Sequence, residues 1–367
     1  MKARFEELAT SQRAGGIESA TGGLVRSLEA QGIQVFRSSE SCGSENQDAP
    51  DIVHFHGTWS PALARHWWHW HKMGVPCMLT VHGMLEPWAL AHKRLKKQVA
   101  WSVYQKRILN RCQLLHATSE REASNLRALG LRPPIALIPW GIEMPTFERT
   151  GDTKQGDVGT APRATISNPL SPISHPRTAL FVGRLYPVKG LPLLIEAWDR
   201  LRPPGWRVQL VGPDEAGHRA ELESQISRAG LSDVFEFTGA LEGRALQQAY
   251  ASADLLVMPS HTENFGMAVA EGMSHGLPVI TTHGAPWKLL EEERCGWWVP
   301  ISVDGIAAAL ADATHRSPAE LAAMGARGRQ VVAERFAWDG IARQFIDCYQ
   351  WLLGEREVPD CVRKFLI

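Results

Sequence analysis

Two glutamates, eight positions apart, lie in the stretch of this sequence whose residue types are best suited to chemistry. The stretch covers residues 259–278 and follows a short apolar run, residues 255–258, which is typical of a buried strand. Glu263 falls in the polar loop after that strand. Glu271 falls in the small, apolar segment that follows, which is typical of a buried helix. One carboxylate should therefore lie in a loop at a strand end and the other within a helix.

The start of this predicted helix is a candidate anion site. Its first backbone N–H groups fall around Phe265, Gly266 and Met267, directly after Asn264. Unsatisfied N–H groups and roughly half a positive charge of helix dipole converge at such a helix end. A phosphate bound there, with the two carboxylates binding hydroxyls, indicates a pocket for a nucleotide sugar.

A basic loop framed by glycines is the second candidate site. It covers residues 183–190, G-R-L-Y-P-V-K-G, and follows an apolar run that is typical of a strand. Arg184 offers a planar fork of N–H donors and Lys189 offers a point charge, a pairing suited to a diphosphate. The alternative is a solvated basic pair on a surface loop, but the framing Gly183 and Gly190 favour a binding loop.

Both motifs resemble those of the retaining glycosyltransferase family 4. The family pattern S-x-x-E-x-F-G-M-x-x-x-E-G-M-x-x-G-x-P-V matches residues 260–279, and its G-R-x-x-x-x-K-G pattern matches residues 183–190. The resemblance is strongest over residues 178–300 and extends over residues 51–145. It implies an α/β fold of the GT-B type, with two doubly wound, Rossmann-like parallel sheets facing a central cleft. It also implies transfer of a sugar from a nucleotide-diphospho-sugar, such as a UDP- or GDP-sugar.

The resemblance assigns roles to individual residues. Glu263 would lie by the transferred sugar, and Glu271 would bind the ribose. Arg184 and Lys189 would hold the pyrophosphate and stabilise its negative charge as the glycosidic bond breaks. His82, in an H-G pair after a predicted strand, would lie against the donor sugar near the reacting centre. The family is thought to react by front-face departure and attack, with the protein positioning and drying the reactants.

A glycine pair near the N-terminus matches the family's phosphate-approaching loop, where only glycine leaves room for a ligand. The pair is Gly15 and Gly16. In the family this loop follows a buried first strand, but residues 1–13 carry little apolar content. We therefore expect the first strand to be missing or badly disguised; if it is missing, either the start codon is placed too late or the sheet begins one strand short.

The acceptor side has three candidate residues, all at predicted strand ends. His56 and Trp59 follow one strand, and Glu120 follows another. Glu120 could equally be a first-turn residue that complements the helix dipole. No partner for it forms the close carboxylate pair with which retaining glycosidases supply a nucleophile.

The sequence predicts neither a metal site nor a cofactor beyond the donor. It contains no D-x-D, which favours metal-free stabilisation of the leaving group by the basic pair. Neither the histidines at 54 and 56 nor those at 66, 69 and 71 provide a convincing set of three ligands at a usual metal-binding spacing. The six cysteines are scattered without a C-x-x-C pair, as expected of reduced thiols.

Alternating predicted strands and helices favour two doubly wound domains. The predicted units are an N-terminal acceptor-side domain over residues 1–147, a flexible linker over 148–177, a nucleotide-sugar-binding domain over 178–340, and a C-terminal helix over 341–367 that returns to the first domain. A long helix is expected over residues 85–110.

The charge balance and hydropathy of the sequence indicate which binding partners to expect. Lys and Arg together number 39, as do Asp and Glu, so no overall field favours nucleic acid. No apolar run is long enough for a membrane span and no signal-peptide core is present, so we expect a cytoplasmic protein. Residues 65–72 and 85–111 combine tryptophan with many basic residues. Such a segment can lie on anionic lipid at the inner face of a membrane, which suits a lipid-linked acceptor, or can be a solvated face with tryptophans packed inward.

Two positions depart from the family pattern. Trp140 stands in I-P-W-G-I-E where I-P-N-G-[IV]-D is usual, and Trp287 stands where G-G-x-x-E is common. Beside the expected cleft, these changes leave the sugar and acceptor undefined. The product is expected to be a cell-surface polysaccharide or glycolipid. The alternatives are a non-catalytic sugar-nucleotide-binding or partner subunit, and a GT-B epimerase that acts on nucleotide sugars without an acceptor.

Overall fold

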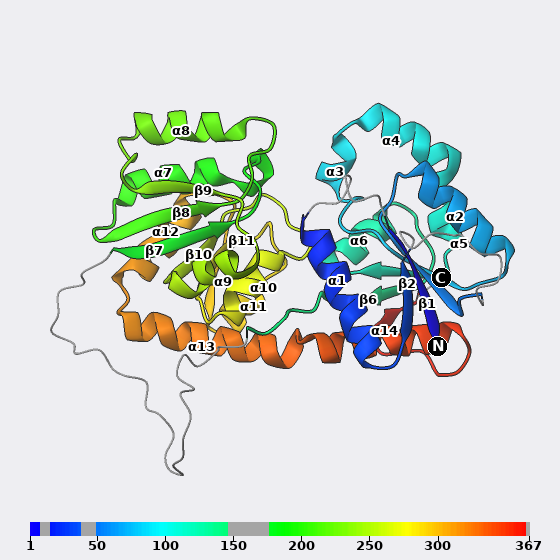
Figure 1. Ribbon diagram of the computed structural model, residues 1–367. Coiled ribbons are helices and arrows are strands. Elements are labelled where there is room, and N and C mark those ends of the chain that lie inside the picture. Colours follow the sequence, from blue (N-terminus) through cyan, green and yellow to red (C-terminus); the bar gives the residue numbers. More distant parts are fainter. Residues whose placement is uncertain (8–14, 38–48, 146–175, 365–367) are drawn as a thin grey trace, which may run out of the picture.

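The computed structural model describes residues 1–7, 15–37, 49–145 and 176–364, so nearly all of the predicted linker lies outside the described residues. Two α/β domains lie side by side, each built on a parallel sheet with helices on its faces (Figure 1). The alternation of short apolar runs with amphipathic segments dictates this arrangement, because parallel strands need helical crossovers.

The first domain contains a seven-stranded sheet in the order β13-β6-β5-β4-β3-β1-β2, and only the pairing of β13 with β6 is antiparallel. Its elements are β1 (Lys2–Glu7), α1 (Gly15–Ala30), β2 (Gln34–Arg37), β3 (Ile52–His56), α2 (Pro61–Lys72), β4 (Cys77–Thr80), β5 (Leu114–Ala117), α6 (Glu120–Ala128), β6 (Ile135–Leu137) and β13 (Val362–Arg363). Strands β3, β4 and β5 are buried along their whole length.

The prediction of a missing first strand was wrong. Strand β1 is present and lies inside the sheet, between β2 and β3. Phe5 is fully buried, whereas its polar neighbours concealed the strand in the sequence. The Glu6 carboxylate is paired on both oxygens. Arg4 Nε lies 2.7 Å from Glu6 Oε1, and His66 Nδ1, from helix α2, lies 2.8 Å from Glu6 Oε2. Buried charge paired in this way is compatible with a central strand.

The prediction of a single long helix over residues 85–110 was also wrong. The segment consists of α3 (Pro87–Ala91), α4 (Arg94–Ala100), a π-helical turn (Trp101–Gln105) and α5 (Lys106–Arg111). Lys93 adopts a left-handed backbone with φ +53°, which separates α3 from α4. Turns of the π type often occur at functional sites, and this one places Gln105 against the loop after β3.

The second domain contains a six-stranded parallel sheet in the order β12-β11-β10-β7-β8-β9. Its elements are β7 (Arg177–Val182), α7 (Leu191–Leu201), β8 (Trp206–Val211), α8 (His218–Arg228), β9 (Phe235–Gly239), α9 (Gly243–Ser252), β10 (Leu255–Met258), α10 (Met267–Ser274), β11 (Val279–Thr282), α11 (Leu289–Glu292), β12 (Gly296–Val299), α12 (Val303–His315) and α13 (Pro318–Arg335). The expected strand before the glutamate loop is β10, and the expected helix after it is α10.

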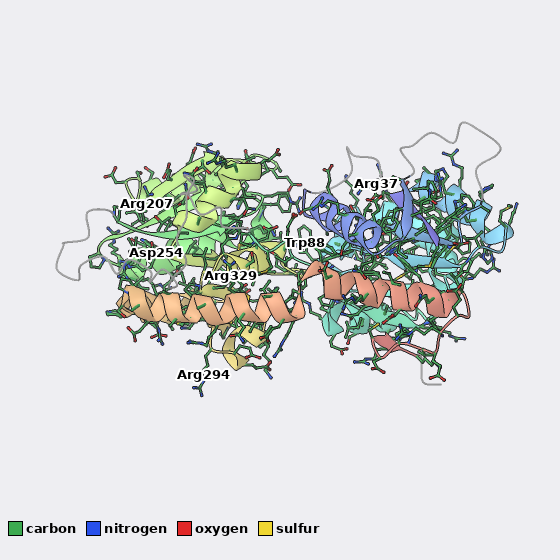
Figure 2. The ribbon with its side chains drawn as sticks, turned by 60° about the horizontal axis from the view of Figure 1, so that its bottom comes forward. Arg37, Trp88, Arg207, Asp254, Arg294 and Arg329 are labelled. Atoms are coloured by element: carbon green, nitrogen blue, oxygen red, sulfur yellow. The ribbon has the colours of Figure 1, made fainter. Side chains whose placement is uncertain are left out.

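The last helix, α14 (Trp338–Leu352), returns to the first domain and packs on α1. Figure 2 shows α13 and α14 nearly end to end, one along each domain. Trp338 begins α14 and fits against two glycines, since a Cβ on Gly23 or Gly141 would lie 2.4 or 2.2 Å from its indole ring. The junction between the domains is therefore fixed by close packing.

Candidate active site

The two domains enclose a cavity of about 160 Å³. One wall comes from the first domain, including Ser19 and Arg26 of α1, and the other includes Tyr250 of α9 and Glu271 of α10. Gly15 and Gly16 form the first turn of α1, just before Ser19. Helices α1, α9 and α10, the segment after β6 and the first residue of α14 line the cavity.

Glu271 lines this cavity from α10. Its carboxylate accepts a hydrogen bond of 2.8 Å from the hydroxyl of Tyr250, and burial raises the pKa of Glu271. The Tyr250 ring is stacked on His275 at 4.8 Å between centroids. A carboxylate held in this way can accept hydrogen bonds from a hydroxyl-bearing ligand, as expected for a ribose.

The start of α10 is held by a tryptophan that the sequence analysis counted only as a departure. Trp287 is buried, and its indole N–H donates to the Phe265 carbonyl at 2.5 Å. Gly266 has φ +86°, and a Cβ there would lie 3.1 Å from the Trp287 nitrogen. Met267 opens the helix and lines the cavity. Trp287 therefore fixes the turn at Phe265 and Gly266, which sets the direction of the N-terminus of α10.

Lys189 and Glu263, predicted separately, lie together. The Lys189 ammonium is 2.6 Å from Glu263 Oε1, and both side chains are less than 15% exposed. Ser260 Oγ donates to the same oxygen at 2.7 Å. The two loops meet closely because Gly190, at φ +68°, leaves room for the Pro259 carbonyl, which would lie 2.0 Å from a Cβ. One cation and one carboxylate thus occupy adjacent strand ends.

Arg184 lies on the same loop as Lys189 but is oriented differently. Its guanidinium pairs with Glu215, and both side chains are more than 40% exposed. Gly183, directly after β7, packs against the ring of Phe181. To bind a pyrophosphate, Arg184 would exchange the Glu215 carboxylate for the phosphate oxygens, so its predicted role stays a prediction.

On the first domain, His82 occupies a left-handed conformation with φ +52° at the end of β4. Its Nε2 lies 3.2 Å from His56 Nδ1, and its ring is stacked on Trp140 at 5.4 Å and 13°. Burial lowers the pKa of His82 to about 3, so the imidazole is neutral near pH 7. Trp140, the second departure from the family pattern, supports this histidine.

Behind His82, two histidines belong to a buried hydrogen-bonded chain. His54 bonds to the Tyr349 hydroxyl and to Thr80 Oγ1, both at 2.7 Å. Thr80 Oγ1 then bonds to His116 Nδ1 at 2.8 Å, and His116 Nε2 donates to a backbone carbonyl. Burial lowers the pKa of His54 well below 6.5 and that of His116 to about 4. Among the described residues no group of three His, Cys, Asp or Glu is arranged to hold a metal ion.

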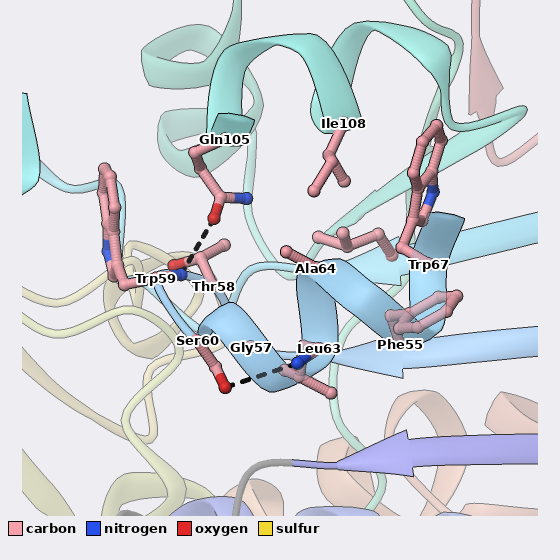
Figure 3. Close-up of a pocket in the computed structure, with 11 residues that line it drawn as sticks. Phe55, Gly57, Thr58, Trp59, Ser60, Leu63, Ala64, Trp67, Gln105 and Ile108 are labelled. Atoms are coloured by element: carbon pink, nitrogen blue, oxygen red, sulfur yellow. Dashed lines mark hydrogen bonds between the residues drawn. The ribbon is translucent and has the colours of Figure 1, made fainter. Parts of the chain in front are cut away.

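Trp59 is held beside a small cavity of about 10 Å³, room for about one water molecule (Figure 3). Its backbone N–H donates to Gln105 Oε1 at 2.9 Å, and its carbonyl accepts from the Tyr104 hydroxyl at 2.8 Å. The π-helical turn therefore fixes the position of Trp59. The cavity itself is too small for a sugar.

Glu120, the third acceptor-side candidate, lies away from the other site residues. Its side chain is 71% exposed and lies 3.8 Å from Arg363 on the edge strand β13. The next two residues of α6 instead contact the site: Arg121 donates to carbonyls of the second domain, and Glu122 accepts from Gly83 N at 2.8 Å. The S-x-x-E spacing from Ser119 to Glu122 is the sequence signature of a capping box, which is the signal that could have drawn attention to Glu122.

Two family models match the chain. The model described as "Glycosyl transferases group 1" matches residues 176–316, and the one described as "Glycosyltransferase Family 4" matches residues 43–144. A D-inositol 3-phosphate glycosyltransferase 2 of Catenulispora acidiphila is 29% identical over 319 residues, which cover 82% of this chain and 70% of the relative. A D-inositol 3-phosphate glycosyltransferase of Saccharomonospora viridis is 26% identical over 376 residues, 94% of this chain and 84% of the relative.

Solved structures resemble the fold. Sucrose-phosphate synthase from Thermosynechococcus elongatus superposes with a TM-score of 0.73 at 19% identity, covering 96% of this chain and 100% of that one. HepE of Anabaena, solved with UDP and glucose, gives 0.70 at 20% identity with the same coverage. WaaG, a glycosyltransferase involved in lipopolysaccharide biosynthesis, gives 0.65 at 16% identity, covering 95% and 99%. The predicted fold is confirmed: the chain belongs to the group 1, family 4 glycosyltransferases and has the GT-B fold.

Proposed function

We propose that this glycosyltransferase takes a hexose from a nucleotide-diphospho-sugar, a UDP- or GDP-sugar, with retention and without a metal ion. The observation that carries the proposal is the meeting of Lys189 with Glu263 at adjacent strand ends, just before helix α10, whose Glu271 lines the cavity. Sugar-diphosphate chemistry needs a cation at the leaving phosphate and carboxylates at hydroxyl groups, and these residues supply both. The solved complexes of HepE with UDP and with UDP-glucose support such a donor.

In this proposal the protein works mainly by charge and position. Lys189 stabilises the negative charge that develops on the pyrophosphate, in a site from which most water is excluded. Glu263, held by Lys189 and Ser260, binds hydroxyls of the transferred sugar. His82 is neutral, and because His56 engages its Nε2, it offers Nδ1 to the sugar without competing with Lys189 for the phosphate. The acceptor hydroxyl gives its proton to the leaving phosphate.

We also propose a lipid-linked acceptor, reached from the inner surface of a membrane, and a product in cell-surface polysaccharide or glycolipid. The support is an apolar stripe on the α4 segment: Leu95, Val99 and Val103 lie four residues apart and are 78%, 65% and 64% exposed. Exposed basic residues flank the stripe, namely Lys93, Arg94, Lys96, Lys106 and Arg107. Basic and apolar side chains together favour binding to anionic lipid. In the described part of the chain, no helix is long and apolar enough to cross a membrane.

One of the observations that suggested a non-catalytic subunit no longer holds. A non-catalytic subunit was suggested by a missing first strand and by two tryptophans, but β1 is present. Trp140 supports His82, and Trp287 fixes the turn into α10. An epimerase remains distinguishable by experiment, because it would turn over the donor without an acceptor.

The decisive experiment is a thermal-stabilisation panel of UDP-, GDP-, ADP- and dTDP-sugars without added metal. A ligand that binds the native chain raises its melting temperature by mass action, so no acceptor need be known. We expect a shift with one nucleotide, lost in Glu271→Ala and retained in Glu120→Gln, which changes an exposed carboxylate elsewhere on the surface. No shift with any nucleotide sugar would contradict the proposed donor.

A further inference from the structure

Helix α6 carries two adjacent residues that reach from the first domain to the second. The Arg121 guanidinium donates to the Gly284 carbonyl at 2.6 Å and also to the carbonyl of Glu263. These two acceptors belong to loops that are joined to each other, since the Glu263 N–H donates to Gly284 O at 2.9 Å. Arg121 therefore holds the backbone of the residue whose side chain pairs with Lys189.

Glu122 makes the complementary set of contacts. Its carboxylate is buried and accepts from Gly83 N and Thr118 N, both at 2.8 Å. The Asn264 amide, oriented by its hydrogen-bond network, donates to Glu122 Oε1 at 2.9 Å and to Oε2 at 3.1 Å. A Cβ on Gly83 would lie 2.9 Å from the Asn264 Cβ, so the two loops are in direct contact. One carboxylate thus joins the turn that carries His82 to the loop that carries Glu263.

A capping role alone does not account for these contacts. Ser119 Oγ already accepts from the Glu122 N–H at 3.2 Å, and a capping box needs only one return bond from the glutamate. The Glu122 carboxylate is directed instead to Thr118, the residue before the N-cap, and to Gly83 and Asn264. A buried carboxylate is costly unless its acceptor sites are filled, and here residues from both domains fill them.

We propose that Arg121 and Glu122 form a cross-cleft clamp that positions Glu263 and His82 for sugar transfer. The inference rests on the proposed function, because the residues positioned are those assigned to the donor sugar. The clamp makes its contacts only when the domains are closed, so closure and alignment of the reacting groups become one event. Arg121 and Glu122 are positioning residues: each acts through a neighbour.

The test separates the cross-cleft contacts from local folding. Asn264→Ala removes the contact from the second domain and leaves the bonds of Glu122 to Gly83 and Thr118 in place, so the first domain keeps its structure. Arg121→Ala removes the other arm, and Arg121→Lys keeps the charge but not the fork. Glu120→Gln, on the same helical turn, is the matched control. Each variant is checked by thermal melting before comparison.

Two readouts need no activity. We expect Arg121→Ala and Asn264→Ala to raise the radius of gyration in solution scattering, and to speed amide exchange of the 261–266 loop, because the closed form loses its contacts. A third readout, transfer from the nucleotide sugar that stabilises the wild-type chain, should fall at least about tenfold in kcat while affinity for the nucleotide of that sugar changes less than about threefold. Arg121→Lys should recover part of the rate.

The outcomes separate the two proposals. Unchanged scattering, exchange and turnover in both Arg121→Ala and Asn264→Ala would overturn the clamp, as would equal losses in Glu120→Gln. If the wild-type chain transfers no sugar from any donor, the proposed function fails, yet scattering and exchange still decide whether α6 holds the domains together.

Discussion

Lys189 and Glu263 form an ion pair of 2.6 Å at the ends of two neighbouring strands, β7 and β10, with most of both side chains removed from solvent. The Lys189 ammonium can therefore hold the Glu263 carboxylate in place and also stabilise negative charge on a ligand. Its removal should affect turnover more than binding, because the charge on the leaving phosphate is largest after the bond begins to break.

Lys189→Ala should lower kcat by about 100-fold or more, the scale seen when one charge-stabilising donor is removed. Binding of uridine or guanosine, which lack phosphates, should be unchanged. Steady-state kinetics and calorimetry measure the two quantities. Lys288→Ala is the control, since Lys288 pairs with Glu292 on an exposed surface. A normal kcat in Lys189→Ala would remove the leaving-group argument.

The hydrogen bond from Tyr250 to Glu271 should set nucleotide affinity. Glu271→Ala should weaken nucleotide binding by about 1–3 kcal/mol, the cost of a buried hydrogen-bond partner left unsatisfied. Tyr250→Phe keeps the Glu271 carboxylate but removes the hydrogen bond that holds it in position, so we expect a smaller loss of nucleotide affinity. Isothermal calorimetry with the nucleotide of the preferred donor measures both. Tyr104→Phe, which removes a hydroxyl from the other domain, should bind normally. Unchanged affinity in Glu271→Ala would show that this carboxylate does not contact the ribose.

The buried histidines should make the fold sensitive to acid. Burial lowers the pKa of His54 well below 6.5 and that of His116 to about 4, so the unfolded chain binds protons first as pH falls. Their contribution to stability is therefore complete above about pH 6.5 and is lost as pH falls through about 4. Each such histidine adds a slope of up to about 1.4 kcal/mol per pH unit in this window.

Urea unfolding across that pH range measures this slope. His116→Asn should flatten it even if the variant is less stable overall, because the slope counts protons and not contacts. An equal slope in wild type and His116→Asn would show that His116 does not titrate as described.

The slot for Trp338 should make Gly141 intolerant of any side chain. A Cβ at Gly141 would lie 2.2 Å from the indole ring, so Gly141→Ala should destabilise the chain by about 1–3 kcal/mol through overpacking. Gly340→Ala is the control, because a Cβ there meets nothing within 4 Å and alanine favours a helix. Combining Gly141→Ala with Trp338→Ala should cost less than the sum of the two changes. Strictly additive denaturation energies would contradict the packing described here.

The sequence predicted the elements that carry local signals. The apolar run of β10, the small residues of α10 and the glycine-framed loop all form where expected, because their residue types decide local structure. Strand β1 was missed because Arg4 and Glu6 are polar, and their burial depends on each other and on His66, far away in sequence. Local composition cannot show such a partnership.

The site was predictable in its parts but not in its pairings. Glu263, Lys189 and Glu271 came from motifs, whereas the contact of Lys189 with Glu263 depends on how two loops meet in space. Glu120 and Glu122 are both first-turn carboxylates of α6, and only the S-x-x-E spacing of Glu122 separates them in the sequence. Only the packing of α6 against the Gly83 turn decides which of them is buried and which is exposed.

The apolar stripe of α4 should bind anionic membranes. We expect the chain to sediment with vesicles that contain phosphatidylglycerol and to stay unbound with pure phosphatidylcholine, because basic residues near a lipid surface contribute about 1 kcal/mol each. The double change Leu95→Asp and Val99→Asp should weaken binding by at least about tenfold, since it places charge where acyl chains would be. Ile301→Asp, at an exposed apolar position of the second domain, should bind as wild type. Binding that is equally strong in the double variant would assign the interaction to charge alone, and absence of binding to either vesicle would remove the membrane from the proposed function.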